Sequence, residues 1–339
     1  MKPNSQTDPR HILVGDIGGT KTNLDLYSHA NGKLVPLYQA SYSSESFEAL
    51  ENIIEIFLKE ITQPIHGACF GIAGPVLNDA CKTSNLPWNV TRTVLQAFLH
   101  IPDVFLLNDL EATAYGVLHV EPKDLVILRD GVEDSQGTIA IIAAGTGLGE
   151  AFITKAGDGV HVVASEGGHV DFSPRSELEI EFLRFMRRTH HHVSFEKALS
   201  GQGISNIYHF LIEYRRASEP QWLTDRMAGD DKNAVITKTA LAGEDEICIE
   251  TLDLFTSFYG AEAGNLALKV KATGGVYICG GIAPKIIDKL KDGRFISAFL
   301  DKGRLREMLE NIPVHVVMNE KTALLGAAHY AVNQILAIH

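Results

Sequence analysis

Two short glycine stretches hold the residue types that suit the binding of an anion. The first, Asp16-Ile17-Gly18-Gly19-Thr20, lies between strand-like runs at residues 12–15 and 24–27. Adjacent glycines let the backbone turn sharply without a Cβ in the way of a ligand, and the N–H groups of such a turn can converge on an anion. Thr20 adds a hydroxyl donor, and the Asp16 carboxylate can hold a divalent cation through water. The stretch predicts a β-hairpin whose turn wraps a nucleotide phosphate, with an ordinary glycine hairpin turn as the alternative.

Two other glycine motifs do not fit this turn. A Walker A loop needs Gly-x-x-x-x-Gly-Lys-Thr, and the chain has Gly15 and then Thr20-Lys21-Thr22 without the second glycine. Walker A loops and dinucleotide fingerprints also continue into a helix, whereas residues 23–26 alternate like a strand. The sequence therefore favours a hairpin over either helix-opening loop.

The same pattern recurs about 127 residues further along the chain. Gly145-Thr146-Gly147 lies between strand-like runs at residues 138–143 and 150–154, and a third turn, Gly280-Gly281, leads from a strand into a helix. Backbone exposed at the third turn can accept the flat face of a base or ribose. The repeated strand–turn–strand unit predicts two facing domains, each with a phosphate-binding hairpin.

Polar residues follow the apolar run at residues 104–107. Asn108 and Asp109 stand at its carboxyl end, which is where open α/β sheets place their sites. The alternative is that Asp109 caps the following helix, and the two roles are compatible.

A carboxylate and an imidazole flank two glycines in Glu166-Gly167-Gly168-His169. Glu166 accepts hydrogen bonds from hydroxyls and His169 donates or accepts, which suits a polyhydroxylated ligand; a plain surface loop is the alternative. Glu196, taken alone, has the character of a solvated surface acid. The run His190-His191-His192 reads as a helix end and exposed loop, because adjacent side chains point in different directions.

The bulk composition is that of a soluble globular protein with room for two domains. Of 339 residues 45% are hydrophobic, and 30 basic against 42 acidic residues give a net charge of −12. This charge argues against nucleic acid or an anionic membrane as the main partner. The first ten residues are polar, no run approaches the ~20 apolar residues of a membrane span, and four cysteines show no CxxC spacing. A cytoplasmic protein is expected.

Apolar spacing predicts the elements that must position these residues. Helices are expected over residues 47–61, with Ser46 as a possible N-cap, over 249–271 and over 322–336. Residues 34–42 are expected to add a third strand to the first hairpin.

Taken in order, these motifs resemble the bacterial glucokinase family, within the actin-like, Hsp70-like and hexokinase-like ATPase superfamily. The resemblance runs along nearly the whole chain, through residues 16–20 (DIGGT), 107–109 (LND), 144–149 (AGTGLG), 166–172 (EGGHVDF), 199–201 (LSG) and 280–284 (GGIAP). It implies an α/β, two-domain actin-like ATPase (ribonuclease H-like) fold with a cleft between the domains. The small domain would hold residues 1–110 and 321–339, and the large domain residues 111–320.

The resemblance also implies an ATP-dependent glucokinase and a role for each motif. ATP phosphates would bind at Gly18, Gly19, Thr20, Gly145, Thr146 and Gly147, adenosine near Gly280 and Gly281, and the sugar at Asn108, Asp109, Glu166, His169 and Glu196. Asp109 matches the catalytic base, and Asp16 would orient Mg²⁺ or its water shell. This fits phosphoryl transfer, in which a carboxylate near the C6 hydroxyl suffices as base.

Two further expectations concern metal and assembly. Repressor and kinase relatives in the superfamily carry a zinc-binding Cys/His cluster after the Glu-Gly-Gly-His stretch, but residues 172–175 contain no cysteine, so no structural zinc is expected. A homodimer is a family-level expectation.

Three alternatives stay open at this point. The substrate could be mannose, fructose or an amino sugar instead of glucose. A non-catalytic sugar sensor would need an N-terminal DNA-binding module, for which a hairpin at residue 16 leaves no room. A polymerising actin-like ATPase would not need the Glu166/His169 pair.

Overall fold

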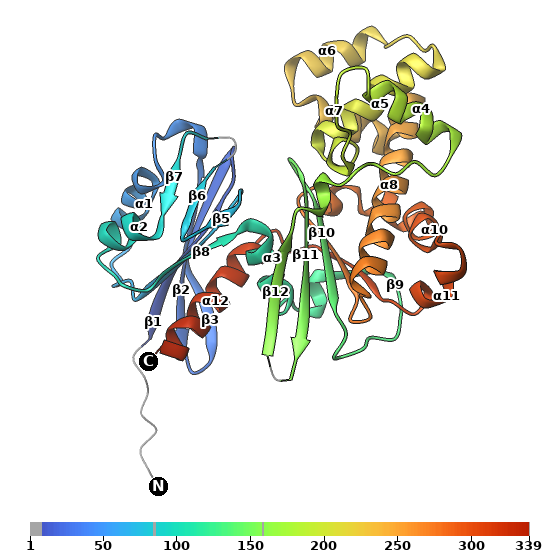
Figure 1. The fold of residues 1–339 in the computed structure, drawn as a ribbon. Coiled ribbons are helices and arrows are strands. Elements are labelled where there is room, and N and C mark those ends of the chain that lie inside the picture. The colour runs from blue at the N-terminus through green and yellow to red at the C-terminus, as the bar shows by residue number, and fades with distance from the viewer. Residues whose placement is uncertain (1–8, 84–85, 158, 339) are drawn as a thin grey trace. The chain divides into compact units, whose positions relative to one another are not determined.

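The chain folds into two compact units. The computed structural model describes residues 9–83, 86–157 and 159–338. The first unit comprises the chain up to residue 121 together with residues 319–339, and the second comprises residues 122–318 (Figure 1). Residues 1–8, most of the polar N-terminal stretch, lie outside the described part.

The first unit is built on a five-stranded sheet. Its strand order is β3 (Lys33–Ser43), β2 (Lys21–Ala30), β1 (Arg10–Ile17), β4 (Gly67–Ile72) and β8 (Val104–Asn108). β1 pairs antiparallel with β2 and parallel with β4. The predicted first hairpin and third strand are therefore confirmed. A small second sheet, which the apolar pattern of the sequence does not predict, holds β5 (Val76–Leu77), β6 (Ala80–Lys82) and β7 (Asn89–Thr91).

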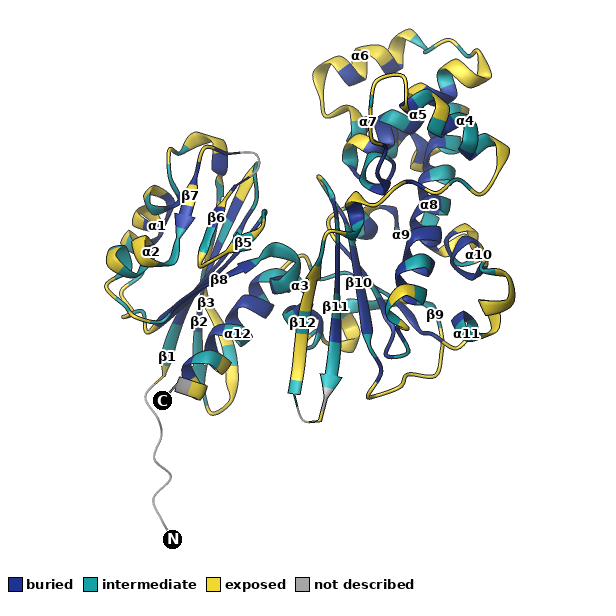
Figure 2. Cartoon of the chain, viewed as in Figure 1, coloured by how far each residue is buried: buried dark blue, intermediate teal, exposed yellow. Residues whose placement is uncertain are grey.

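Helices cover both faces of this sheet. Successive side chains of a strand point to opposite faces, and β1 shows this: Leu13 packs among residues of α1 (Leu50–Lys59), whereas Ile12 and Val14 pack with α12 (Thr322–Ile338). Helix α2 (Arg92–Leu99) lies on the α1 side and α3 (Asp109–Val117) on the α12 side (Figure 1). Burial on both faces explains why β1, β4 and β8 are so apolar (Figure 2).

Helix α3 belongs to the first unit, although the predicted boundary at residue 110 assigned most of it to the large domain. The physical reason is a close crossing of α3 and α12 at small residues. A Cβ on Gly116 would lie 1.9 Å from the Thr322 carbonyl oxygen, and one on Gly326 would lie 1.9 Å from that of Ala112. The boundary therefore follows the end of α3 and not the end of β8.

The second unit repeats the arrangement of the first. Its six-stranded sheet has the order β12 (Gly159–Ser165), β11 (Leu148–Ala156), β10 (Ile139–Ala144), β13 (Val276–Cys279), β14 (Val314–Val317) and β9 (Leu125–Arg129). As with β1, the strand β10 pairs antiparallel with its hairpin partner β11 and parallel with β13. The predicted second hairpin is confirmed.

Eight α-helices of the second unit lie within its described residues. They are α4 (Glu177–Met186), α5 (Gly201–Arg215), α6 (Gln221–Gly229), α7 (Lys232–Ala242), α8 (Glu246–Val270), α9 (Ile287–Lys291), α10 (Arg294–Leu300) and α11 (Arg306–Glu310). The long helix α8 confirms the helix predicted over residues 249–271. Its buried side chains, such as Phe255 and Tyr259, join the core that also contains Ile142 of β10.

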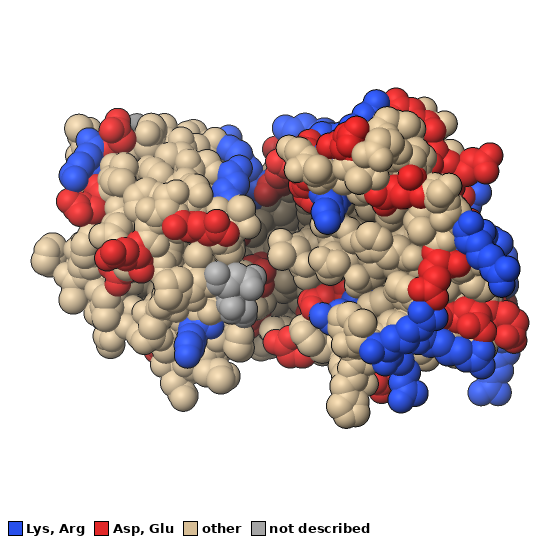
Figure 3. All heavy atoms as spheres, turned by 90° about the horizontal axis from the view of Figure 1, so that it is seen from above, with Lys and Arg blue, Asp and Glu red and all other residues tan. Residues whose placement is uncertain are grey.

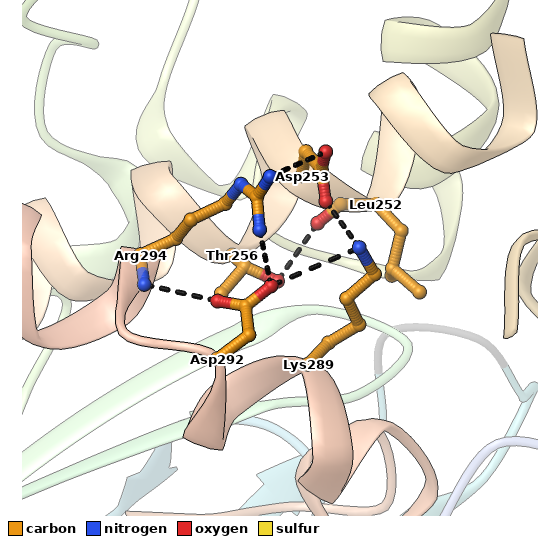
Figure 4. Close-up of polar contacts among 6 residues, drawn as sticks. All are labelled: Leu252, Asp253, Thr256, Lys289, Asp292 and Arg294. Atoms are coloured by element: carbon orange, nitrogen blue, oxygen red, sulfur yellow. Dashed lines mark hydrogen bonds and ion pairs between the residues drawn. The ribbon is translucent and has the colours of Figure 1, made fainter. Parts of the chain in front are cut away.

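An ion-pair network holds α9 and α10 against α8 (Figure 4). The Lys289 ammonium contacts the carboxylates of Asp253 and Asp292, and Arg294 contacts the same two carboxylates, with 3.2 Å between Arg294 Nη2 and Asp253 Oδ2. Two acids and two bases alternate, so the network is neutral as a whole. It fixes the helices that follow the Gly280–Gly281 turn in the chain.

The predicted N-cap of the first helix is wrong. α1 begins at Leu50, not near residue 47, and Ser46 lies in a short 3₁₀ turn (Ser44–Ser46). The Asn52 side chain accepts a hydrogen bond from the Ala49 N–H at 3.1 Å and so satisfies the start of the helix. The N-cap residue is Ala49, and its N–H is satisfied by a side chain from inside the first turn.

The charged side chains of the surface and the hydropathy of the helices are those expected from the amino-acid composition. Acidic and basic side chains both occur over the face drawn in Figure 3. In the described part of the chain, no helix combines the length and the apolar character that crossing a membrane requires.

Candidate functional site

The first glycine turn is held by a serine distant in sequence. Gly18 N–H donates to the Lys21 carbonyl at 2.9 Å, which closes the turn. Ser44 then fastens it: its N–H donates to the Thr20 carbonyl at 2.9 Å and its hydroxyl to the Gly18 carbonyl at 2.8 Å. Thr20 itself is exposed, so its hydroxyl is available to a ligand.

Asp16 lies near the end of β1, beside the first glycine turn. Its carboxyl is partly buried and is oriented by a neighbouring side chain. Asn23, its partner in the β1–β2 register, donates an amide N–H to Asp16 Oδ2 at 3.4 Å. Ser41 in turn donates to Asn23 Oδ1 at 2.7 Å. Burial raises the pKa of Asp16, against a smaller lowering by Asn23. A single oriented carboxylate, with phosphate oxygens supplied by a substrate, is a donor set that suits Mg²⁺.

Asn108 is the N-cap of α3, and Asp109, the first residue of the helix, accepts the Leu110 N–H as well, through Oδ1 at 2.9 Å. Asn108 Oδ1 accepts from Leu110 N–H at 2.9 Å, and Glu111 Oε2 accepts from Asn108 N–H at 2.9 Å, so the two form a reciprocal capping box. The Asn108 amide also donates to the Gly74 carbonyl at 3.0 Å. Asn108 therefore holds the N-cap position, and Asp109 lies in the first turn with one carboxyl oxygen bonded to the backbone.

The Asp109 carboxyl has an unusually high pKa for an aspartate. Burial is the main cause, the negative charge of Asp16 adds to it, and together they raise the pKa of Asp109 to about 6. Close approach of α3 to β4 contributes to the burial, since a Cβ on Gly71 would meet Ala112 Cβ at 2.9 Å and Asp109 Cα at 3.7 Å. A carboxylate with a pKa near the working pH is a suitable general base.

The second glycine turn is held by a carboxylate. Gly145 N–H donates to the Gly147 carbonyl at 2.9 Å, and Gly201 N–H donates to the Gly145 carbonyl at 2.8 Å. The Leu148 N–H donates to Glu196 Oε2 at 3.1 Å. A Cβ on Gly147 would lie 2.6 Å from the same oxygen, so a larger residue there would displace the Glu196 carboxylate.

The structure brings Glu166, His169 and Glu196 together within the second unit. His169 Nδ1 lies 3.9 Å from Glu166 Oε2, and His169 Nε2 lies 3.8 Å from Glu196 Oε1. Glu196 comes from a separate 3₁₀ turn (Phe195–Lys197), and its side chain is 26% exposed. These gaps are too long for direct hydrogen bonds, so the three side chains keep free capacity to bond to a ligand.

The third glycine turn, Gly280–Gly281, packs against Ala144, the residue that precedes the second turn. Gly280 has φ +85°, and a Cβ there would lie 2.5 Å from the Ala144 carbonyl oxygen. Ile282 N–H donates to that same oxygen at 3.3 Å. Around Gly281, in contrast, no heavy atom of the described chain would meet an added Cβ within 4 Å. The backbone at Gly281 is therefore open to a flat group.

Comparison with known proteins decides the family. The family model described as Glucokinase matches residues 13–334. The glucokinase of Trichormus variabilis is 43% identical over 94% of this chain and 97% of that protein, and the glucokinase of Synechocystis is 40% identical with the same coverage. This chain belongs to the glucokinase family.

Solved structures agree with the glucokinase assignment. The crystal structure of a glucokinase from an Antarctic psychrotroph has a TM-score of 0.82 and 30% identity, covering 97% of this chain and all of that one. A ROK family glucokinase from Streptomyces griseus, in complex with glucose and AMPPNP, has a TM-score of 0.66 at 18% identity and covers 96% and 99% of the two chains. The fold is that of the actin-like sugar kinases, as predicted, and ATP-dependent phosphorylation of glucose is the activity of the family.

Sequence reasoning missed several residues that support this glucokinase site. Nothing in the sequence around Ser44 predicts a role at the first turn, and the run of three histidines predicts only an exposed loop for His192. The His192 ring donates from Nε2 to the His169 carbonyl at 2.9 Å, and its Nδ1 lies 3.3 Å from Asp171 Oδ1. Only the spacing of polar residues around the motifs could have signalled these contacts, and that signal is weak.

No group of three or more His, Cys, Asp or Glu side chains in the described residues is arranged to hold a metal ion. The four cysteines are all free and buried.

Proposed function

We propose that this member of the glucokinase family transfers the γ-phosphoryl group of ATP to the C6 hydroxyl of D-glucose with Mg²⁺. The observation that carries the proposal is the Asp109 carboxyl: Asn108 holds the N-cap position, Asp109 Oδ1 is oriented by the Leu110 N–H, and a pKa of about 6 leaves the carboxyl mostly ionised at pH 7. Asp109 accepts the hydroxyl proton as the oxygen attacks phosphorus.

The other side chains position the sugar. Glu166, His169 and Glu196 offer carboxylate and imidazole groups with unused hydrogen-bonding capacity. Asn108 keeps one amide N–H beyond its bond to Gly74. Fixing the ring by several such bonds aligns the C6 hydroxyl for attack, which is a large part of the rate gain in phosphoryl transfer.

The glycine turns hold the phosphates and the nucleoside. We assign the backbone of Gly18, Gly19, Thr20, Gly145, Thr146 and Gly147 to the phosphates and that of Gly280 and Gly281 to adenosine. Asp16 would hold Mg²⁺ through water, and the ion would neutralise charge on the phosphates. Asp109 lies near Asp16 and also has a raised pKa. The positive charge of the ion would lower the pKa of Asp109, because a nearby cation favours the ionised base.

Three finer points belong to the same proposal. We also propose a cytoplasmic location, a homodimer, which the family resemblance implies, and no structural zinc, because the segment after His169 lacks cysteine. Other hexoses remain the alternative substrates, since these contacts recognise a hexose better than one particular hexose.

The test is glucose-dependent ADP production from MgATP by wild type, Asp109→Ala and Asp109→Asn. We expect both variants to bind glucose and to lose roughly 10²–10⁴ in kcat, the usual contribution of a general base. Activity on another hexose but not on glucose would refute the substrate. ATP hydrolysis that is equal in all three proteins, with or without sugar, would refute the kinase mechanism.

A further inference from the structure

A buried carboxyl lies directly beneath the loop that carries Glu166 and His169. Glu150 is the third residue of β11, is 1% exposed and pairs with Ser165, the residue that leads into the loop. A Cβ added to Gly167 would lie 1.9 Å from Glu150 Oε2. The carboxyl therefore touches the loop backbone midway between the two side chains.

The surroundings of Glu150 do not favour a negative charge. Its neighbour Glu262 on α8 is fully buried and already takes the nearby hydrogen-bond donors: Lys269 Nζ at 3.0 Å and Asn265 Nδ2 at 2.8 Å. The second oxygen of Glu150, Oε1, is buried without a hydrogen-bond partner in the described chain. An unpaired buried charge is costly, so the group binds a proton instead. Burial first, and then the charge of Glu262, raise the pKa of Glu150 to about 8.

The remaining titratable groups nearby are few. α8 contributes Glu262, Lys269 and Tyr259, the loop itself carries Glu166 and His169, and Lys302 lies beyond Glu262. Lys269 is the only one of them that lowers the pKa of Glu150, and its ammonium is bonded to Glu262. The balance favours one proton on the Glu150–Glu262 pair at neutral pH.

We propose that Glu150 is a positioning residue for the loop Glu166–His169, that its neutral acid form supports the loop, and that loss of its proton weakens hexose binding. The part about hexose binding rests on the proposed function, whereas the part about the loop does not. A negative charge on Glu150, beneath Gly167, would be desolvated and unpaired. Displacement of the loop would admit water to the carboxylate and so reduce the cost of this charge. Glu166 and His169 would move with the loop.

The first test compares wild type with Glu150→Gln, which imitates the neutral acid at every pH. Hydrogen exchange of the segment 166–169, corrected for intrinsic rates, should rise in wild type between pH 7 and 9 and stay level in the variant. Glucose affinity, measured by calorimetry, should fall by about tenfold in wild type over that range, as linkage predicts for one proton lost near pH 8. It should stay level in Glu150→Gln. Asp25→Asn is the matched control, because Asp25 is a buried acid of the first unit, 2% exposed, and should keep the wild-type profile.

These readouts separate the two hypotheses. Equal pH dependence of loop exchange in wild type and Glu150→Gln would overturn the role of Glu150, whatever the enzyme does with glucose. Loop exchange that behaves as expected in a protein without glucose turnover would instead refute the proposed function. Should Glu150→Gln fail to fold, Glu262→Gln serves: removing the charge that raises the pKa of Glu150 should move the transition to lower pH.

A second test uses the contact alone. Gly167→Ala places a methyl group against Glu150 Oε2 and should raise the KM for glucose, and adding Glu150→Ala should make room and restore the KM to that of the single variant Glu150→Ala. Gly168→Ala is the control, because its Cβ would lie 2.0 Å from the backbone oxygen of Leu148, which no side-chain substitution removes. Restoration of both glycine variants by Glu150→Ala, or of neither, would contradict the proposed contact.

Discussion

The two hairpin turns share a topology but are held by different kinds of group. In the first unit, Ser44 fixes the turn by bonding to the carbonyls of Gly18 and Thr20. In the second unit, the Glu196 carboxylate accepts the Leu148 N–H, and the same side chain faces His169. The first turn therefore depends on a group with no proposed contact to substrate, whereas the second depends on a proposed sugar ligand.

This difference between the two turns suggests a way in which glucose binding can affect ATP binding. A sugar hydroxyl bonded to Glu196 would orient a carboxylate that also sets the geometry of the turn at Gly147. In the first unit no such shared group occurs among the described residues that fasten the turn. We expect the second turn to respond to glucose and the first to be preorganised.

The largest effect that tests this comparison is expected from Glu196→Gln. Neutralising the acceptor weakens a hydrogen bond to a charged group, worth about 1.5–3 kcal/mol, so kcat/KM for glucose should fall by roughly 10–150-fold. The KM for ATP should rise as well, because the turn at Gly147 loses its support. Steady-state kinetics with both substrates varied measures this. An unchanged KM for ATP would show that the carboxylate serves the sugar only; Glu213→Gln, an exposed acid of α5 paired with Arg188, is the control.

The next effect concerns the cost of keeping Asp109 ionised. Its folded pKa of about 6 lies above the ordinary value of 3.8. The folded state therefore binds the proton more tightly than the unfolded state, and Asp109 reduces stability as pH rises from about 4 to 6. Asp109→Asn should raise the free energy of unfolding by about 1–3 kcal/mol at pH 7 and by little at pH 4. Urea unfolding at both values checks this, and a gain that is equal at both would contradict the assigned pKa.

The sequence predicted those parts of the site that depend on residues close to one another in the chain. The hairpins, the turn glycines and the approach of Glu166 to His169 follow from neighbouring residues and from period-2 patterning. Ser44 and Glu196 reach their turns across 24 or more positions, and nothing local marks them. Glu196 read as a surface acid for this reason; only the family resemblance pointed to it.

Errors in the fold have the same origin. The strands of the small sheet β5–β7 have only two or three residues each, too few for a clear apolar pattern. The strand β9 has four consecutive apolar residues and was not among the predicted strands. The boundary at residue 110 failed because the crossing of α3 and α12 depends on Gly116 and Gly326, which lie far apart in sequence. Glycines inside helices signal a close approach but do not identify the partner.

A smaller effect is expected from Ser44→Ala in the first unit. Ser44 is fully buried and its hydroxyl also bonds to that of Thr22 at 2.9 Å. Its removal should lower the free energy of unfolding by about 1–2 kcal/mol and raise the KM for ATP several-fold, because the Gly18 carbonyl is released. Glucose affinity should not change. A parallel loss of glucose affinity would mean that the first turn is coupled to the sugar like the second, and the comparison would fail.

The smallest effect is expected at the ion-pair network of α8, α9 and α10. Lys289 lies between Asp253 and Asp292 and is 18% exposed. Lys289→Met removes its charge but keeps most of its apolar stem, and Arg294 still balances part of the acidic charge. We expect a loss of about 0.5–1 kcal/mol in unfolding free energy, reduced further by salt. Glucose kinetics should stay at wild-type values, since no proposed ligand contact involves these helices. A marked rise in the KM for ATP alone would show that the network also positions the Gly280–Gly281 turn, which precedes α9. Ion pairs between helices would then support a third turn, beside the serine and the carboxylate compared above.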